Sequence, residues 1–237
     1  VAAIVSGGSA PTRAAKEATK TIPIVMAFDI DPVGSGLVAS LARPGGNLTG
    51  LSTLAPEISG KHIEFLKEII PGLSRVAALE TSTIPGSAQE LKEVELVARA
   101  LAVQIQHIEV RNPEDIEMAF RAANKARAEA VLVGTSRIFF SHRTQVALLA
   151  AKYRLPAMYI EQEFVLAGGL MTYATSIADL YRRAATYVDK ILKGAKPSEL
   201  PIEQPTKFEL IINLKAAKQI GLTIPPNVLA RADKVIK

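Results

Sequence analysis

Glycine and hydroxyl residues follow the first apolar segment of the chain, in the run Ser6-Gly7-Gly8-Ser9-Ala10-Pro11-Thr12. The run comes after a predicted strand at 2–5 and opens a predicted helix at 11–19. Glycines let backbone amides approach a ligand closely, and a helix N-terminus favours negative charge. The run could bind a carboxylate or phosphate, and it could equally be a capped turn without a ligand. It has no lysine after its glycines and is not a GxGxxG fingerprint, which disfavours nucleotide binding.

Two carboxylates, Asp29 and Asp31, follow the predicted strand at 22–28. Carboxylates two residues apart could bind a cation or orient an amine. Asp31 also precedes Pro32, which is ordinary turn chemistry. Further oxygen ligands for a metal ion are not evident nearby, so the pattern does not predict a metal site.

Polar side chains also follow three later strands. Thr81 and Ser82 come after the strand at 75–79, where their hydroxyls could donate to a ligand or cap the next helix. Ser136 lies in a loop with two phenylalanines, a mixture that suits a small ligand with an apolar body or simple core packing. Glu161 could take a ligand ammonium group or form a surface ion pair.

Signals for catalysis and cofactors are weak. The chain has no cysteine, which excludes disulfides, thiolate metal sites and cysteine nucleophiles. Its three histidines, His62, His107 and His142, do not have metal-ligand spacing, and no G-x-S-x-G elbow is present. The sequence therefore predicts a protein that is not an enzyme and uses no cofactor and no metal.

Composition favours a packed globular protein. The chain has 237 residues, 49% of them apolar, and a net charge of +5 from scattered basic residues. Scattered charge disfavours nucleic-acid binding. The sequence contains no run of eighteen apolar residues, so it predicts no membrane span, and no signal segment is visible. Because Val1 already opens a strand-like run, we expect an N-terminal part to be absent from this chain.

Apolar runs alternate with helical patterns, and most of the runs are continuous, as in strands buried on both faces of a parallel sheet. The predicted strands are 2–5, 22–28, 75–79, 104–110, 130–133, 157–160, 170–173 and 208–212. The predicted helices are 11–19, 57–70, 87–101, 113–126, 142–153, 177–192, 214–220 and 226–236. This order predicts a doubly wound α/β fold. The break at 43–47 indicates passage from one α/β domain to another, with a ligand between them.

Two motifs carry a family resemblance that covers nearly the whole chain. They are RPGGN-TG at 43–50 and IN-x-x-A-A-x-x-I-G-L-x-I-P at 212–225. With these motifs the chain resembles the ABC transporter substrate-binding proteins of the tryptophan/tyrosine-binding type, which are type I periplasmic binding proteins.

The resemblance implies two doubly wound parallel-sheet lobes joined by a three-segment hinge. Lobe one would comprise 1–48 and 173–237 and would lack its N-terminal strands, and lobe two would comprise 49–172. The expected crossings are 46–52, 173–176 and 204–208. The positions that match the expected ligand cleft are Gly7, Gly8, Ser9, Asp31, Ser52, Thr81, Ser82, Ser136, Tyr159, Glu161 and Tyr173.

The resemblance also implies a function. The chain would be the receptor of an ABC importer, periplasmic or anchored at the cell surface, with a small-molecule ligand and an ABC permease as its partners. The expected ligand is an amino acid or a related carboxylate. Its carboxylate would rest on the amides of Gly7, Gly8 and Ser9, and Glu161 or Asp31 would take the ammonium group. The alternatives are a ligand-sensing regulatory domain of the same fold and an α/β enzyme.

Overall fold

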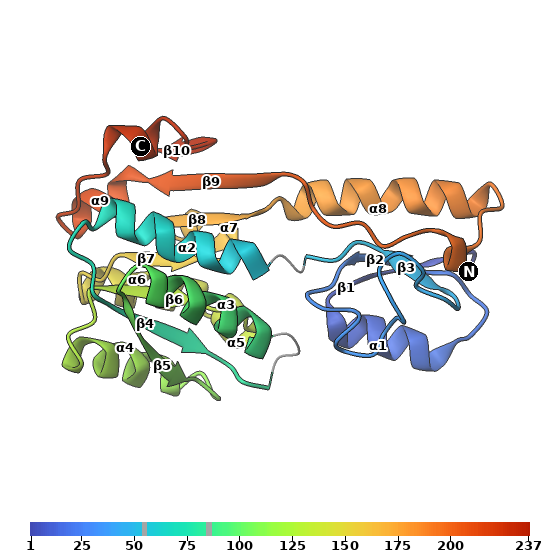
Figure 1. Cartoon of the computed structure of the whole chain (residues 1–237), viewed down its shortest axis with the longest axis horizontal. Helices are drawn as coiled ribbons and strands as arrows, with labels where there is room; N and C mark the ends of the chain where they lie inside the picture. The colour runs from blue at the N-terminus through green and yellow to red at the C-terminus, as the bar shows by residue number, and fades with distance from the viewer. Residues whose placement is uncertain (54–55, 84–86) are drawn as a thin grey trace. The chain divides into compact units, whose positions relative to one another are not determined.

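The computed structural model describes residues 1–53, 56–83 and 87–237 (Figure 1). The chain forms two compact units, each built from segments that are distant in sequence. The first unit comprises Val1–Ala55 and Thr175–Phe208, and the second comprises Pro56–Ala174 and Glu209–Lys237. Three segments of the chain therefore pass from one unit to the other.

The first unit contains a three-stranded parallel sheet in the order β1-β2-β3. Its elements are β1 (Ile4–Gly7), α1 (Ser9–Ala18), β2 (Ile24–Phe28), β3 (Leu48–Gly50), α8 (Ile177–Leu192) and the 3-10 helix η1 (Pro197–Glu199). Side chains of β2 alternate between two cores: Val25 and Ala27 pack with α8, and Ile24 and Met26 pack with the 37–41 segment. The central strand is thus covered on both faces, as its continuous apolar sequence predicts.

The second unit contains a seven-stranded sheet in the order β10-β9-β8-β7-β6-β4-β5. Its strands are β4 (Arg75–Glu80), β5 (Gln104–Glu109), β6 (Ala130–Val133), β7 (Ala157–Tyr159), β8 (Met171–Thr175), β9 (Phe208–Asn213) and β10 (Lys234–Ile236). Its helices are α2 (Pro56–Ile69), α3 (Ser87–Ala100), α4 (Asp115–Lys125), α5 (Arg137–Ser141), α6 (Arg143–Lys152), α7 (Gln162–Leu166), α9 (Leu214–Gln219) and α10 (Pro226–Leu229).

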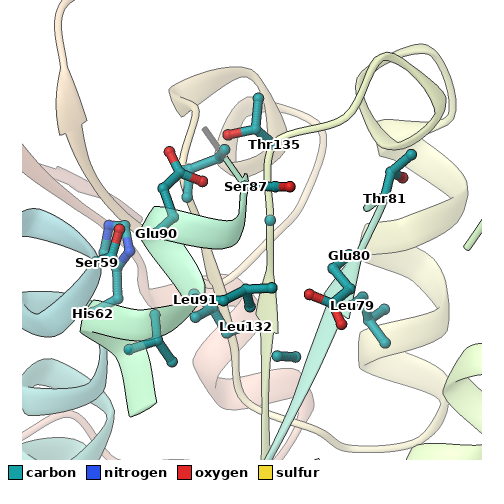
Figure 2. A pocket seen from close by; sticks show the side chains of 14 residues that line it. Ser59, His62, Leu79, Glu80, Thr81, Ser87, Glu90, Leu91, Leu132 and Thr135 are labelled. Carbon is teal, nitrogen blue, oxygen red and sulfur yellow. The ribbon is translucent and has the colours of Figure 1, made fainter. Parts of the chain in front are cut away.

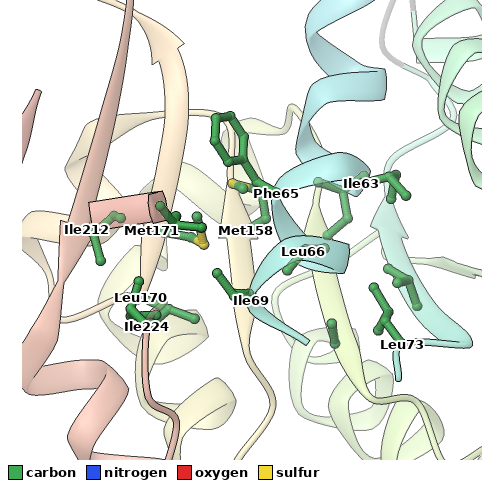
Figure 3. Packing of buried hydrophobic residues seen from close by; sticks show 14 of the residues in the cluster. Ile63, Phe65, Leu66, Ile69, Leu73, Met158, Leu170, Met171, Ile212 and Ile224 are labelled. Atoms are coloured by element: carbon green, nitrogen blue, oxygen red, sulfur yellow. The ribbon is translucent and has the colours of Figure 1, made fainter. Parts of the chain in front are cut away.

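Alternate residues of the second sheet enter two separate cores. In β6, Ala130 and Leu132 face the core formed with α2, α3 and α9, whereas Val131 and Val133 face the core formed with α4 to α7. Figure 3 shows the first of these cores, in which Ile63, Leu66 and Ile69 of α2 belong to the same cluster as Met158 and Met171 of the strands. This three-layer arrangement is the doubly wound α/β fold expected from the sequence.

The C-terminal segment Glu209–Lys237 lies in the second unit, whereas the sequence predicts it to be part of the first lobe. The reason is strand pairing and packing. β9 lies beside β8 in the seven-stranded sheet, and Ile212, Ile224 and Val228 are buried in the core that also holds Leu66. Residues 49–53 belong to the first unit, not to the second, because Leu48–Gly50 forms β3 against β2.

Some predicted elements differ from the structure. The tail helix predicted at 226–236 ends at Leu229, and Lys234–Ile236 forms β10 against β9, in parallel. The short helices α5 and α7 were not predicted, because five residues are too few to show a helical period. Within the described part of the chain, no helix is both long enough and apolar enough to cross a bilayer.

Candidate functional site

A pocket of about 40 Å³ lies at the carboxyl ends of β4 and β6 in the second unit. The strand order β5-β4-β6-β7-β8 reverses direction between β4 and β6, since the chain first moves outward to β5 and then returns to the other side of β4. Open α/β sheets bind ligands at such a switch point, where the following helices diverge. The pocket is therefore where the topology places a ligand site in this unit.

Polar side chains from several elements converge on this pocket (Figure 2). Ser59, His62 and Glu90 face it from one side, from α2 and α3. Glu80, at the end of β4, faces it from the other side, and Thr81, which follows β4, also lines it. The remaining polar lining comes from Ser87 and Thr135, and the apolar lining comes from Ala78, Leu79, Leu91, Val94, Leu132 and Ile160.

His62 is the most deeply buried polar group of the pocket, with 2% of its surface exposed. Its Nε2 lies 2.7 Å from the carbonyl oxygen of Tyr173. A carbonyl can only accept, so Nε2 carries the proton and Nδ1 is a hydrogen-bond acceptor. Nδ1 has no partner among the described residues. Burial lowers the pKa of His62 to about 4, so the ring is neutral near pH 7.

Two carboxylates stand in the same pocket. Burial raises the pKa of Glu90 to about 7, and a hydrogen bond from the Thr135 side chain opposes this shift. Burial also raises the pKa of Glu80, and His107, whose Nδ1 lies 3.3 Å from Glu80 Oε1, opposes it. Glu80 Oε2 is buried and has no partner within the described part of the chain. The pocket therefore offers hydrogen-bond acceptors and negative charge.

Thr81 and Ser136 are brought together by the fold, because they follow β4 and β6, which are neighbours in the sheet. Their hydroxyl oxygens are 3.0 Å apart, and both side chains are buried. Thr81 Oγ1 also lies 2.9 Å from the Val110 carbonyl oxygen, and Ser136 accepts from the Ile138 amide as the N-cap of α5. Of the two, only Thr81 lines the pocket. The role of these hydrogen bonds is structural: they stabilise the ends of the two strands and the first turn of α5.

Glu161 follows β7 and precedes α7 as its N-cap residue. Burial raises its pKa to about 7, and the nearby charge of Glu163 adds to this shift. Arg137 and Arg143 act in the opposite direction. A partly buried carboxylate at a strand end remains a candidate for binding a ligand donor.

Three other predicted residues of the second unit have structural partners. Tyr159 is the last residue of β7, but its side chain is fully buried in the core and stacks on Phe164, with 5.0 Å between ring centroids. Tyr173 packs its ring against Phe65 at 5.1 Å. Ser82 is exposed, and its amide and hydroxyl both donate to Glu109 Oε1.

In the first unit, Gly7, Gly8 and Ser9 form the turn between β1 and α1. Gly8 is the N-cap of α1 with a φ of 88°, a conformation that favours glycine, and its amide donates to the Phe28 carbonyl. The amides left for a ligand are those of Ser9 and Ala10, since the first turn of a helix has no intrahelical acceptors. A Cβ at Gly7 would meet Tyr181 Oη at 2.5 Å.

Of the two aspartates of the first unit, Asp31 has the turn role that the sequence left open as the alternative to ligand binding. Asp31 accepts the Gly34 amide at 2.8 Å and shapes a turn. Asp29 is fully buried, and its Oδ2 has no partner within the described residues. Burial raises its pKa, and hydrogen bonds from the Ser9 side chain and the Asp31 amide oppose this. Ser52 is also fully buried, and its amide donates to the Glu203 carbonyl.

Sequence reasoning missed several residues of these sites. His62 and Glu90 fall inside helices with no motif around them, and only the fold turns them toward the strand ends. Phe28 and Tyr181, which meet edge to face with centroids 6.1 Å apart, come from β2 and α8. A partial signal existed for His62: it lies nearly two turns into α2, on the same face as the apolar residues that bury that helix.

Residues 1–236 match the family model of the ABC transporter substrate binding protein. The chain is 24% identical over 210 residues to the tyrosine-binding protein of Clostridioides difficile (strain R20291), and the match covers 89% of this chain and 60% of that protein. The chain thus spans less than two thirds of the length of this curated relative.

Among the described residues, no group of three or more His, Cys, Asp or Glu is arranged to hold a metal ion.

Solved structures agree with this match. An ABC domain from Streptococcus pneumonia in complex with L-Trp is 27% identical, with a TM-score of 0.89 over 99% of this chain and 81% of that chain. A conserved domain protein from Vibrio cholerae is 28% identical, with a TM-score of 0.91 over 99% of this chain and 78% of that chain. The fold is that of the type I periplasmic binding proteins, and the chain belongs to the family of ABC transporter substrate-binding proteins.

Proposed function

We propose that this protein is a solute-binding receptor of an ABC importer, which captures a small ligand and delivers it to a membrane permease. The observation that carries the proposal is the family match, which spans residues 1–236 and therefore includes both α/β units. The proposed function involves no catalytic step and no cofactor. Its setting is the periplasm or the outer cell surface, where importers collect their solutes.

The proposed ligand is an amino acid or a related small carboxylate, with aromatic amino acids first. Relatives in the same family include a tyrosine-binding protein and a domain in complex with L-Trp. In the first unit, the Phe28–Tyr181 aromatic pair stands beside the Gly7 turn, and 47% of the Tyr181 surface is exposed. An exposed ring can stack on an aromatic ligand, and the α1 N-terminus suits a carboxylate.

Isothermal titration calorimetry tests this proposal. L-tryptophan, L-tyrosine, L-leucine, L-aspartate and glucose are titrated into the protein, and we expect binding of the aromatic amino acids. Tyr181→Ala should weaken that binding about three- to ten-fold, because an aromatic contact contributes about 0.5–1.5 kcal/mol. Leu192→Ala is the matched control, since Leu192 is exposed near the other end of the same helix.

The outcomes separate ligand class from function. Binding of glucose without any amino acid would overturn the ligand class and retain the receptor. Binding of L-leucine or L-aspartate without the aromatic amino acids would retain the class and overturn the aromatic preference. Absence of binding across a wide solute panel would contradict the receptor itself. Unchanged aromatic affinity in Tyr181→Ala would remove Tyr181 from the site.

A further inference from the structure

Asp29, directly after β2 in the first unit, is a buried carboxylate with an unused acceptor. None of its surface is exposed. Its Oδ1 accepts the Asp31 amide at 3.1 Å, whereas its Oδ2 has no partner among the described residues. A buried carboxylate oxygen without a donor destabilises the fold, because the hydrogen bonds that it made to water are not replaced. A donor supplied from outside is therefore stabilised at Oδ2.

Two backbone amides at the start of α1 have no acceptor among the described residues, those of Ser9 and Ala10. The third residue of the helix is Pro11, which has no amide hydrogen, and the Thr12 amide donates to the Gly8 carbonyl at 3.2 Å. The two amides are adjacent and stand at the positive end of a ten-residue helix. A carboxylate, with two oxygens, matches them.

Ser9 belongs to both features and limits the distance between them. Its side chain lies within hydrogen-bonding reach of the Asp29 carboxyl, and its amide is the first of the two α1 amides. Within one serine the amide nitrogen and the hydroxyl oxygen are at most about 4 Å apart, so the nearest Asp29 oxygen lies within about 7 Å of that nitrogen. An α-amino acid carries its ammonium and carboxylate on one carbon, and with a hydrogen bond of about 3 Å at each end it spans this distance.

The charges around the Asp29 carboxyl favour a ligand with both signs of charge. Arg13 and the helix N-terminus are positive, and Asp31, which already accepts the Gly34 amide, is negative. A ligand with only a carboxylate would leave Asp29 Oδ2 without a donor. A ligand with only an ammonium group would leave the two α1 amides without an acceptor and would meet the positive end of the helix. A zwitterion satisfies both groups.

We infer that Asp29 is the residue that binds the ligand ammonium in the first unit: its Oδ2 accepts from the α-ammonium of an amino acid whose carboxylate is held by the amides of Ser9 and Ala10. The inference rests on the proposed function and narrows its ligand class from small carboxylates to zwitterions. Asp29 takes the role that the sequence predicts for Asp31 or Glu161. Because Asp29 has no exposed surface, the ammonium group enters beside the half-buried Ser9 side chain and replaces it as a donor to the carboxyl.

A thermodynamic cycle between ligand and protein tests this contact by calorimetry. L-tryptophan and 3-(indol-3-yl)propionate, which lacks only the ammonium group, are titrated into the wild type, Asp29→Asn and Glu17→Gln. Glu17 is the matched control, an exposed carboxylate near the C-terminal end of α1. In the wild type and the control, loss of the ammonium group should weaken binding about 30-fold, as expected when one partner of a buried charge pair is removed. In Asp29→Asn the same loss should cost less than about threefold, because the charge pair is already absent.

The ratio of the two affinities separates a direct contact from a structural effect. A substitution that only disturbs the fold weakens both ligands alike, so a wild-type ratio in Asp29→Asn would overturn the inference. Equal affinity of the wild type for the two ligands would also overturn it, and the proposed function would stand. If the wild type binds glucose and no amino acid, the ligand class and this inference are both wrong, and the receptor stands. Absence of all binding would contradict the receptor and the inference together.

A measurement on the wild type keeps the test independent of whether Asp29→Asn folds, which circular dichroism shows. The ¹³Cγ resonance of Asp29 is followed while each ligand is added. It should shift more with L-tryptophan than with the deamino analogue, because only L-tryptophan brings an ammonium group to the carboxyl. Shifts of equal size with the two ligands, or no shift with L-tryptophan, would overturn the inference.

Discussion

Two titratable residues of the same pocket respond to pH in opposite directions. Burial lowers the pKa of His62 to about 4, below its ordinary value of 6.5. Its stabilising contribution is present above pH 6.5 and is lost as the pH falls toward 4. Burial raises the pKa of Glu90 to about 7, above its ordinary value of 4.5, so its contribution is present below pH 4.5 and is lost as the pH rises through 7. As the pH rises from about 4 to 7, His62 increases the free energy of unfolding of the wild type and Glu90 decreases it, so the two contributions largely cancel.

Replacement of Glu90 by glutamine should expose this cancellation. The variant has no carboxyl to ionise at position 90, so it avoids the loss of stability that the wild type suffers between pH 4.5 and 7. We expect the difference in unfolding free energy, variant minus wild type, to be larger at pH 8 than at pH 5 by about 2–3 kcal/mol. Urea denaturation at the two pH values measures it. Glu114→Gln should show no pH-dependent difference, and an equal difference at both pH values for Glu90→Gln would contradict the prediction.

At the level of elements, the contact between β2 and β3 depends on a glycine. Gly50 ends β3 with a φ of 135°, and a Cβ there would lie 2.1 Å from the backbone oxygen of Met26. Backbone atoms of a central strand cannot move aside as a flexible side chain can. The same strand is tied to the segment after α8 by a hydrogen bond of 2.8 Å from Thr49 Oγ1 to the Leu200 carbonyl.

Gly50→Ala should therefore destabilise the first unit by about 3 kcal/mol or more. Chemical denaturation followed by circular dichroism measures the change. Gly72→Ala is the matched control, because a Cβ at this exposed glycine meets nothing within 4 Å, and its effect should stay within about 0.5 kcal/mol. Equal stability of the two variants would show that the sheet relaxes around position 50.

At the scale of the whole molecule, the described hydrophobic cores fall into two independent sets. The cores around Leu180 and Leu48 draw all their residues from the first unit, and the cores around Leu66 and Phe120 draw all theirs from the second. Units with separate cores unfold as separate cooperative blocks unless their interface couples them.

Differential scanning calorimetry should accordingly resolve two transitions. Leu66→Ala and Leu180→Ala each remove a fully buried side chain, and each should cost about 3 kcal/mol in its own unit. We expect each substitution to lower the midpoint of a different transition by several degrees. Leu96→Ala, at a residue with 66% of its surface exposed, should move neither midpoint. A single transition lowered by both core variants would show that the units unfold together.

The sequence alone determined the α/β class, the alternation of elements and the family. Continuous apolar runs such as 130–133 predict buried parallel strands, because burial on both faces removes the polar alternation. It also placed Thr81 and Ser136 each directly after a strand, and the fold then brings their hydroxyl oxygens to 3.0 Å. These features depend on local patterns, which the residues themselves carry.

The tertiary structure alone decided which side chains share a site. Whether Glu209–Lys237 joins the first or the second unit depends on the strand that β9 pairs with, and pairing partners distant in sequence leave no local pattern. For the same reason Tyr159, which follows a strand pattern, enters the core, while His62 and Glu90, which lie within helical patterns, reach the switch point. The sequence pattern indicates where along a strand or helix a residue lies. The direction in which a side chain meets another element is fixed only when the elements pack.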